Sequence, residues 1–313
     1  IVRAPYKGQE IHIEVLKKGL LDKDVSIGST LIEMYTSCGL LCVAHDVFDK
    51  LPNRDIYSWN ALIGGYVTHE CDEKALECFD EVQSHWDLTP DAVTYVCALK
   101  ACGSIGNAVR GQQICAEIEI QGLQQQKFVG SAMVDMLAKC RLFTLAQEVF
   151  ERIQYHDVVA WTSLISGYAQ FGTADIVVTL FDSMIREEVK PSLVTFTVVL
   201  NACSHAGLVK EGDLIFHYMD EVYDLNPTLE HYTCMVDTFS RAGHFDKAGA
   251  VIDLVPSYNC LQLWLSILGA CCKLVNLELG IWAFEQSIKL DQRCVVAYVY
   301  LGNIYATASI RAI

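Results

Sequence analysis

Apolar residues recur along this chain at intervals of three and four, in short stretches separated by glycine or polar breaks. Near the start, Trp59, Leu62 and Tyr66 form one such stripe, and Leu76 and Phe79 belong to a second. This spacing places the apolar side chains on one face of a helix. Each pair of stripes therefore predicts two amphipathic helices joined as a hairpin.

The same pattern returns about a hundred residues later, as a repeat array does. Ser29 recurs as Ser131, and Asp55 recurs as Asp157, in the same local context. The recurring positions divide the chain into a partial unit and seven full units, followed by a C-terminal segment. The predicted bounds are 1–24 for the partial unit, then 25–55, 56–91, 92–126, 127–157, 158–192, 193–228 and 229–260, then 261–313.

Several stretches of the chain resemble plant-type pentatricopeptide repeats of the P-L-S subclass. They include SWNALIGGYVTHECDEKALECFDEV at 58–82, NACSHAGLVKEG at 201–212 and EHYTCMVDTFSRAGHFDKA at 230–248. The segment 261–313 resembles the E motif that ends such arrays and is also similar to tetratricopeptide repeats. The resemblance implies an all-α fold, a right-handed α-solenoid superhelix of helix-turn-helix repeats, with 1–24 as a partial L-type repeat.

Helical repeats of this type read about one RNA base per repeat. The resemblance implies that the fifth and last residues of a unit contact the base edge and that the second residue packs against the base. The implied pairs are Ser29 with Asp55, Asn60 with Asp91, Ser131 with Asp157 and Thr162 with Ser192, and the packing residues include Tyr57, Val93, Phe128, Val159 and Val194.

In the family's code, Ser or Thr with Asp implies guanine, and Asn with Asp implies uracil. From the N-terminal side, in a parallel sense, this gives guanine, uracil, an unread base and guanine, and it leaves the Thr162 unit ambiguous. Positions that depart from the pattern are Val96 with Gln126, Thr197 with Thr228, Thr233 with Cys260, and the second residues Ser26 and Glu230.

A structural role competes with base reading for the aspartates. Asp55, Asp91 and Asp157 each directly precede a predicted helix, where an Asp N-cap stabilises by about 0.5–2 kcal/mol over Ala. Capping explains the three aspartates without RNA. It does not explain why Asn60 and Ser131 place polar groups at one recurring position among apolar neighbours.

Charge weighs against strong binding of a nucleic-acid backbone. The formal net charge is −15, with only 23 Lys and Arg residues, whereas backbone affinity comes largely from cationic side chains that release counterions. Any RNA binding must then depend on local chemistry in the groove. No apolar run approaches the ~18 residues of a membrane span, so no membrane partner is expected.

The sequence contains no convincing enzyme or metal motif. His12 and Glu14 satisfy the H-x-E half of a zinc deaminase signature, but no P-C-x-x-C follows. Cys38, Cys42 and His45 have only weak zinc-like spacing. The 14 cysteines follow the repeat, which indicates reduced cysteines in helix packing. The chain is therefore expected to lack enzymatic activity, cofactors and a small-molecule substrate.

Two functions from different classes remain open. The first is a sequence-specific single-stranded RNA-binding protein that acts as an organellar C-to-U editing site-recognition factor, with a deaminase supplied elsewhere through the C-terminal segment. It implies a mitochondrial or chloroplast location, and the chain resembles an excerpt without its targeting peptide. The alternative is an acidic helical-repeat scaffold for protein–protein interaction. Only the first requires affinity that depends on base identity and salt.

Overall fold

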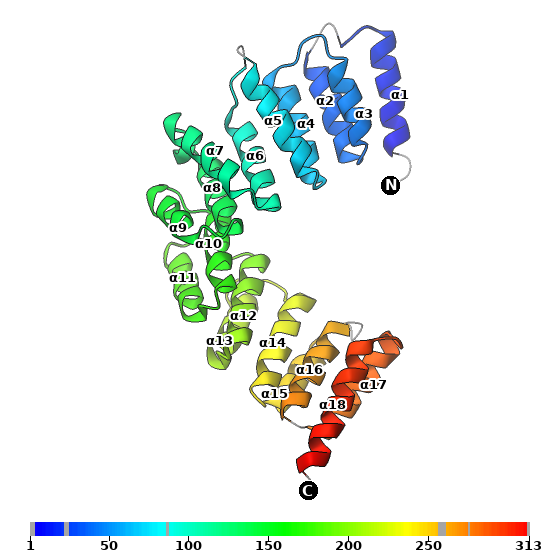
Figure 1. The fold of residues 1–313 in the computed structure, drawn as a ribbon, viewed down its shortest axis with the longest axis vertical. Helices are drawn as coiled ribbons and strands as arrows, with labels where there is room; N and C mark the ends of the chain where they lie inside the picture. The colour runs from blue at the N-terminus through cyan, green and yellow to red at the C-terminus, as the bar shows by residue number, and fades with distance from the viewer. Residues whose placement is uncertain (1–3, 22–24, 86–87, 256–260, 275, 312–313) are drawn as a thin grey trace. The chain divides into compact units, whose positions relative to one another are not determined.

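The computed structural model describes residues 4–21, 25–85, 88–255, 261–274 and 276–311. Within these ranges the chain is helical and has no strand, which confirms the expected all-α helical-repeat class (Figure 1). The helices are α1 (Ala4–Lys17), α2 (Val25–Ser37), α3 (Leu41–Asp49), α4 (Ile56–Thr68), α5 (Asp72–Ser84), α6 (Ala92–Ile105), α7 (Ala108–Ile120), the 3-10 turn η1 (Leu123–Gln125), α8 (Lys127–Lys139), α9 (Phe143–Arg152), α10 (Val158–Gln170), α11 (Ala174–Arg186), α12 (Leu193–Ala206), α13 (Val209–Glu221), α14 (Leu229–Arg241), α15 (Phe245–Asp253), α16 (Leu261–Leu274), α17 (Leu277–Leu290) and α18 (Val295–Arg311).

The chain divides into two compact units, 1–164 and 165–313, and the division falls within α10. In the first unit, α2, α4, α6 and α8 pack one against the next, and α3, α5, α7 and α9 each pack on the first helix of their own hairpin. In the second unit, α12, α14, α16 and α18 pack in the same way, with α13, α15 and α17 beside them. Each unit is thus a two-layered array of hairpins.

The first helices begin at regular points in the sequence. The helices α2, α4, α6, α8, α10, α12, α14 and α16 start at residues 25, 56, 92, 127, 158, 193, 229 and 261. These are the residues at which the units predicted from the sequence begin. The predicted unit ends at residues 24 and 260, and Cys260 itself, lie outside the described residues.

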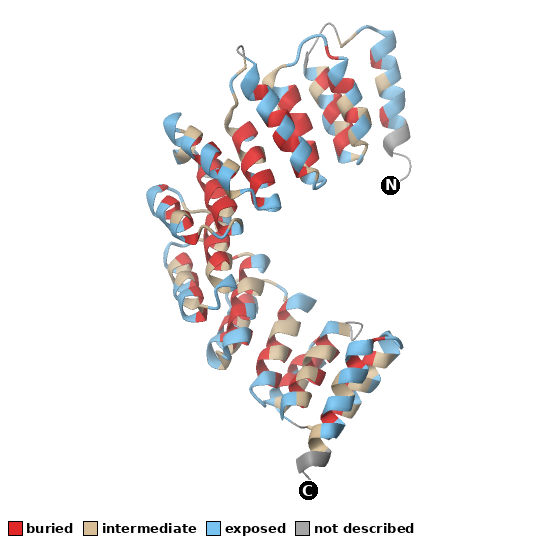
Figure 2. Ribbon diagram, in the orientation of Figure 1, coloured by how far each residue is buried: buried red, intermediate tan, exposed pale blue. Residues whose placement is uncertain are grey.

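The core lies between the two layers, where the apolar stripes meet (Figure 2). Phe48 of α3 meets Trp59 of α4 edge-on, with ring centroids 4.4 Å apart. One cycle later Phe150 of α9 meets Trp161 of α10 in the same way at 4.7 Å. Each such aromatic pair adds about 0.5–1.5 kcal/mol beyond the area it buries. The repeat in the sequence therefore reproduces one packing contact.

Recurring caps set the ends of the first helices. Asp91 and Ser192 are the N-caps of α6 and α12, and each accepts a hydrogen bond from the amide three residues on. Gly106 and Gly207 end the same helices in the left-handed region, with φ of 70° and 72°, where glycine carries no steric penalty. These caps hold the last residue of one hairpin against the first turn of the next.

The thirteen cysteines among the described residues are all free thiols. Burial raises the pKa of Cys102 to about 11 and that of Cys203 to about 12, so both stay protonated at neutral pH. They pack as small apolar side chains. None of the described helices combines the length and the hydropathy that crossing a bilayer requires.

Candidate nucleic-acid interface

In five of the first helices, α4, α6, α8, α10 and α12, the second residue is an apolar side chain that faces solvent, whereas Ser26 of α2 and Glu230 of α14 depart from this pattern. Among Tyr57, Val93, Phe128 and Val159 in the first unit, and Val194 in the second, exposure ranges from 49% to 72%. Neighbouring residues on the same helices are almost fully buried, as Trp59 and Trp161 are. Exposed apolar side chains thus recur at one position of successive hairpins.

The fifth residue lies one helical turn further along the same face, because residues three apart share a face of an α-helix. Ser29, Asn60 and Thr162 are half-buried at this position, and Ser131 is 2% exposed. In the hairpins that begin at residues 56, 127, 158 and 193, an exposed apolar side chain therefore stands next to a more recessed polar one. This is the arrangement that the sequence predicted for packing and edge contacts to a base.

Asn60 and Asp91, which the family resemblance implies as a base-reading pair, are joined by hydrogen bonds. The Asn60 amide nitrogen donates to Asp91 Oδ1 at 3.0 Å and to Oδ2 at 3.1 Å. The hydroxyl of Thr94, the third residue of the next hairpin, donates to Asn60 Oδ1 at 2.7 Å. Thr94 also accepts from the Asp91 amide at 3.2 Å. We call these three residues the Asn60 node.

The Asn60 node fixes the direction of the Asn60 amide. Its nitrogen faces a carboxylate and its oxygen faces a hydroxyl, so the side chain cannot flip without losing both sets of contacts. One amide hydrogen and one oxygen lone pair remain for a ligand. Asp91 Oδ1 also accepts from the Thr94 amide at 2.9 Å, so the carboxylate caps α6 and orients Asn60 at the same time.

Ser131 and Asp157 also come together. The Ser131 hydroxyl donates to Asp157 Oδ1 at 2.8 Å. The same oxygen accepts from the amides of Val159 at 3.0 Å and Ala160 at 2.9 Å, which caps α10. Because Ser131 is almost wholly buried, the half-exposed Asp157 carboxylate is the part of the pair that a ligand meets first.

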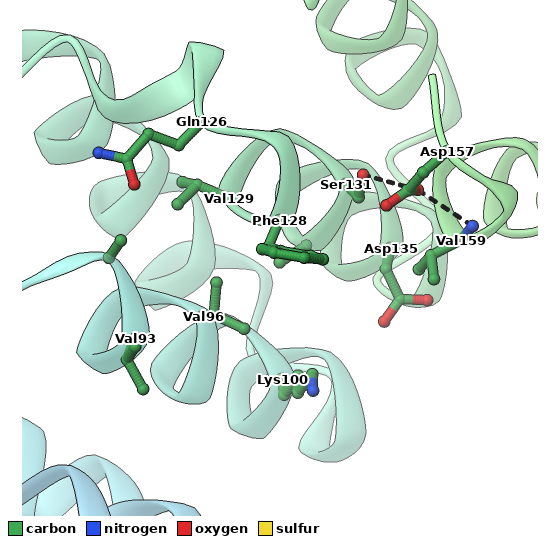
Figure 3. Close-up of a pocket in the computed structure, with 12 residues that line it drawn as sticks. Val93, Val96, Lys100, Gln126, Phe128, Val129, Ser131, Asp135, Asp157 and Val159 are labelled. Carbon is green, nitrogen blue, oxygen red and sulfur yellow. Dashed lines mark hydrogen bonds between the residues drawn. The ribbon is translucent and has the colours of Figure 1, made fainter. Parts of the chain in front are cut away.

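A pocket of about 350 Å³ lies beside this pair, between α6 and α8 (Figure 3). Phe128 and Val159 border it together with side chains of α6, and Lys100 and Asp135 bring charges of opposite sign. The lining is mostly apolar, with polar groups from few positions. A mostly apolar lining with a few polar groups is typical of sites that bind small ligands or parts of larger ones. The lining residues are Ala92, Val93, Val96, Lys100, Gln126, Phe128, Val129, Ser131, Ala132, Asp135, Asp157 and Val159.

Ser29 and Asp55 are not joined by a hydrogen bond in the described part of the chain. The Ser29 hydroxyl donates to the carbonyl of Ser26 at 2.9 Å, within its own helix. Asp55 accepts from the Ser58 amide at 2.8 Å as the N-cap of α4. In this hairpin the aspartate acts as a cap, the structural role that the sequence also suggested.

Thr162 lies in the first compact unit and Ser192 in the second. Thr162 is half-buried on α10. Ser192 caps α12 by a reciprocal arrangement with Thr195, whose hydroxyl accepts from the Ser192 amide at 3.0 Å. Within its own unit, Ser192 therefore acts as the N-cap of α12.

The third residue of the following hairpin is a position of the candidate interface that sequence reasoning missed. Thr94 connects the fifth residue of one hairpin to its last residue, and His231 makes the equivalent connection in the second unit. Both side chains have no exposed surface. The signal was present: a polar residue three positions after a capping Thr or Asp is the pattern of a capping box.

The histidines that resembled deaminase or zinc motifs are bonded to tyrosines. His12 Nδ1 lies 2.9 Å from the Tyr35 hydroxyl, and His45 Nδ1 lies 2.9 Å from the Tyr66 hydroxyl. Each pair ties the second helix of one hairpin to the first helix of the next. Across the described residues no group of three or more potential ligands is arranged to hold a metal ion.

Two family models match the chain. The first, described as a PPR repeat family, covers residues 54–104 and 156–205, and the second, described as a PPR repeat, covers 194–222 and 230–260.

Relatives from Arabidopsis thaliana align with nearly the whole chain. The putative pentatricopeptide repeat-containing protein At1g68930 is 35% identical over 96% of this chain and 40% of its own length. The mitochondrial protein At3g11460 is 33% identical over 96% and 48%, and the chloroplastic protein CRR2 is 36% identical over 96% and 46%. The chain thus spans less than half the length of the curated relatives it matches.

Solved structures show the same fold. The pentatricopeptide repeat protein PPR10 in complex with an 18-nt psaJ RNA element matches 97% of this chain and 46% of its own, with a TM-score of 0.76 and 19% identity. PPR10 from maize matches 96% of this chain and 44% of its own, with a TM-score of 0.71 and the same identity.

Proposed function

The chain belongs to the pentatricopeptide repeat family, and from this premise we propose that it is a sequence-specific single-stranded RNA-binding protein. The observation that carries the proposal is the Asn60 node, where an oriented amide lies one turn from the exposed ring of Tyr57. We take the hairpins between 25 and 260 as seven repeats, the segment 1–24 as a partial repeat and 261–313 as a terminal motif.

The proposed contacts depend on what each side chain still offers. A base packs on the exposed second residue, as bases do on apolar and aromatic side chains. Its edge then meets the fifth and last residues. At Asn60 the free amide hydrogen suits a base carbonyl, and Asp91 Oδ2, which receives only the Asn60 amide among the described residues, suits an imino proton. Uracil supplies both groups, whereas cytosine presents a lone pair where uracil has its imino proton.

The negative charge of the chain favours RNA binding through contacts to the bases over contacts to the phosphate backbone. With a net charge of −15, few phosphates can be neutralised, and each neutralised phosphate contributes a slope of about −0.7 to the salt dependence of single-strand binding. A shallow salt dependence combined with strong dependence on base identity is therefore expected.

The proposed biological role is that of a site-recognition factor in C-to-U editing of organellar transcripts. Chloroplastic and mitochondrial proteins are among the relatives, which supports an organellar location. The repeats would choose the site, and the segment 261–313 would bring a deaminase or other editing protein in trans. The two-helix packing of α16 and α17 with α18 against them provides a surface for such a contact.

The test measures binding of the intact chain to short single-stranded RNAs by fluorescence anisotropy. The reference RNA carries guanine, uracil, any base and guanine opposite the first four full hairpins, and variants change only the second base. Asn60→Ser with Asp91 retained should move the preference at that base from uracil towards guanine. Asn303→Ser, on the exposed surface of α18 outside the seven hairpins, should leave it unchanged.

An unchanged base preference in Asn60→Ser contradicts this assignment of reading positions. Binding that depends on neither base identity nor salt contradicts the RNA-binding proposal and favours the acidic scaffold. The two outcomes are distinguishable because the first retains a base preference at other positions and the second has none.

A further inference from the structure

His231 is a histidine without exposed surface at the start of α14. It lies between Thr197, the fifth residue of the hairpin 193–228, and Thr228, its last residue. The family's code leaves this Thr–Thr pair unassigned. A base-reading role for the pair rests on the proposed RNA-binding function and concerns this one hairpin.

Two backbone groups determine which nitrogen of His231 carries the proton. The Thr228 amide can only donate, and it lies 3.1 Å from Nδ1, so Nδ1 accepts. The Leu193 carbonyl can only accept, and it lies 3.0 Å from Nε2, so Nε2 carries hydrogen. The neutral ring with hydrogen on Nε2 satisfies both groups. Desolvation by burial lowers the pKa of His231, which agrees with a neutral ring.

This tautomer sets the direction of both threonine hydroxyls. The Thr228 hydroxyl is 2.7 Å from the bare Nδ1, so it must donate its hydrogen to the ring. The Thr197 hydroxyl donates to the Leu193 carbonyl at 3.1 Å and accepts from Nε2, also at 3.1 Å. Both hydroxyl hydrogens therefore point into the protein, and each oxygen keeps a lone pair for a ligand.

Thr228 is exposed and Thr197 is half-buried, so the pair is accessible to a base edge. Val194, 61% exposed and one helical turn before Thr197, offers the packing surface. The pair thus presents two hydrogen-bond acceptors and no hydroxyl donor. The Asn60 node differs, because it presents an amide donor next to a carboxylate acceptor.

We infer that the hairpin 193–228 binds guanine, because Thr197 and Thr228 are held as two acceptors by the buried ring of His231. Guanine is the one common RNA base with two adjacent donors, N1–H and the N2 amino group, on its Watson–Crick edge. Adenine, cytosine and uracil each place an acceptor next to a single donor or donor group. Against two protein acceptors, each of these bases leaves one acceptor facing another.

The test uses the intact chain and the RNA 5′-GUUGUXU-3′, in which X faces the hairpin 193–228 in the parallel sense. Each net hydrogen bond contributes about 0.5–1.5 kcal/mol, so RNA with guanine at X should bind about fivefold more tightly than RNA with any other base. Substituting the second base, opposite Asn60, in the same series reports on the proposed function independently.

Three variants test the role of the His231 ring in the guanine preference. His231→Leu removes the acceptor from Thr228, frees its hydroxyl hydrogen to turn outward, and should reduce the guanine preference to less than about twofold. His231→Asn returns an acceptor oxygen near the place of Nδ1 and should retain the preference. His217→Leu, a matched change on the exposed face of α13, should behave as the unmodified chain.

If His231→Leu does not fold, as judged by its thermal unfolding curve, Thr228→Val provides the same test at an exposed position, and loss of the guanine preference is again expected. Retention of that preference in either variant overturns the inference. Equal affinity for all four bases at X, with uracil still preferred opposite Asn60, overturns it and leaves the proposed function intact. Absence of RNA binding overturns both.

The ring can also be examined without RNA. Long-range proton–nitrogen NMR spectra of ¹⁵N-histidine-labelled protein distinguish the two neutral tautomers. A His231 signal with hydrogen on Nε2 supports the inference. Hydrogen on Nδ1 would reverse both hydroxyl assignments and overturn it.

Discussion

The Asn60 node of the first unit and the Thr197–Thr228–His231 cluster of the second share one skeleton. In each, the third residue of one hairpin accepts a hydrogen bond from the backbone amide of the last residue of the hairpin before it. The distance is 3.2 Å for Thr94 and 3.1 Å for His231. In each, the same side chain also reaches the fifth residue, at 2.7 Å and 3.1 Å. The chemistry that they present to a ligand nevertheless differs.

The difference lies in how the last residue reaches the fifth. Asp91 contacts Asn60 directly with a charge, and the small Thr94 hydroxyl can adapt its direction. In the second unit the last residue is uncharged, and an imidazole whose hydrogen is placed by the backbone connects it to the fifth residue. In the second cluster the buried third residue therefore sets the direction of both threonine hydroxyls, whereas in the Asn60 node the amide and the carboxylate themselves determine what is presented.

The largest expected effect comes from removing the charge of the Asn60 node. Asp91→Ala loses a helix cap, about 1 kcal/mol, and also a charge-assisted bond to Asn60, so it should lower the free energy of unfolding by about 2 kcal/mol in total. Asp55→Ala loses only a cap and should cost about 1 kcal/mol. Urea unfolding followed by circular dichroism measures both, and equal losses would show that the Asn60 contact adds nothing.

The next effect concerns the third residue alone. Thr94→Val keeps the shape of the buried side chain but leaves the Asp91 amide and Asn60 Oδ1 without their partner, which should cost about 1.5 kcal/mol. Thr68→Val, on an exposed part of α4, should stay within about 0.5 kcal/mol of the unmodified chain. The same unfolding experiment applies. An unchanged free energy of unfolding in Thr94→Val would show that Thr94 does not stabilise the Asn60 node.

A smaller effect is the energetic coupling between Asn60 and Asp91. A double-mutant cycle of Asn60→Ala and Asp91→Ala should give an interaction energy of about 1 kcal/mol, because their side chains share two contacts. The cycle of Ser29→Ala and Asp55→Ala should give about zero, since no hydrogen bond joins these two residues in the described structure. Coupling of similar size in both pairs would contradict the difference between these hairpins.

The smallest effect is a pH dependence confined to the second cluster. Burial lowers the pKa of His231 below its ordinary value of 6.5, so the unfolded chain binds this proton more readily. The contribution of His231 to stability is therefore complete above pH 6.5 and declines as pH falls through that value towards the lower pKa of the folded protein. His231→Asn should flatten this part of the profile relative to the unmodified chain, as measured by unfolding at a series of pH values. Parallel profiles would contradict a neutral buried ring.

Much of the fold is encoded in local sequence. Apolar spacing of three and four places Trp59 and Trp161 on buried faces, and the first helices begin at the residues where the pattern restarts. The family resemblance implied that the second position of a unit packs against a base; Tyr57 and Phe128 are exposed there, and their role in packing stays a prediction. These features depend on a few neighbouring residues, which is why the sequence alone predicted them.

Which pairs meet depends on packing that the spacing does not reveal. Ser29 with Asp55 and Ser131 with Asp157 have the same separation and the same residue types, yet of these two described pairs only the second is hydrogen-bonded. The short Ser29 hydroxyl bonds to the carbonyl of Ser26 instead. A serine has two partners within reach, and small differences in helix approach decide between them.

The sequence by itself determined the helical hairpins and the recurring buried apolar face of each helix, because both rest on the 3.6-residue period of a helix that must bury one side. The tertiary structure alone decided that Thr94 and His231, which also cap their own helices, reach the fifth residue of the preceding hairpin. Those contacts span two helices, and no local period specifies where a buried side chain of the next hairpin will end.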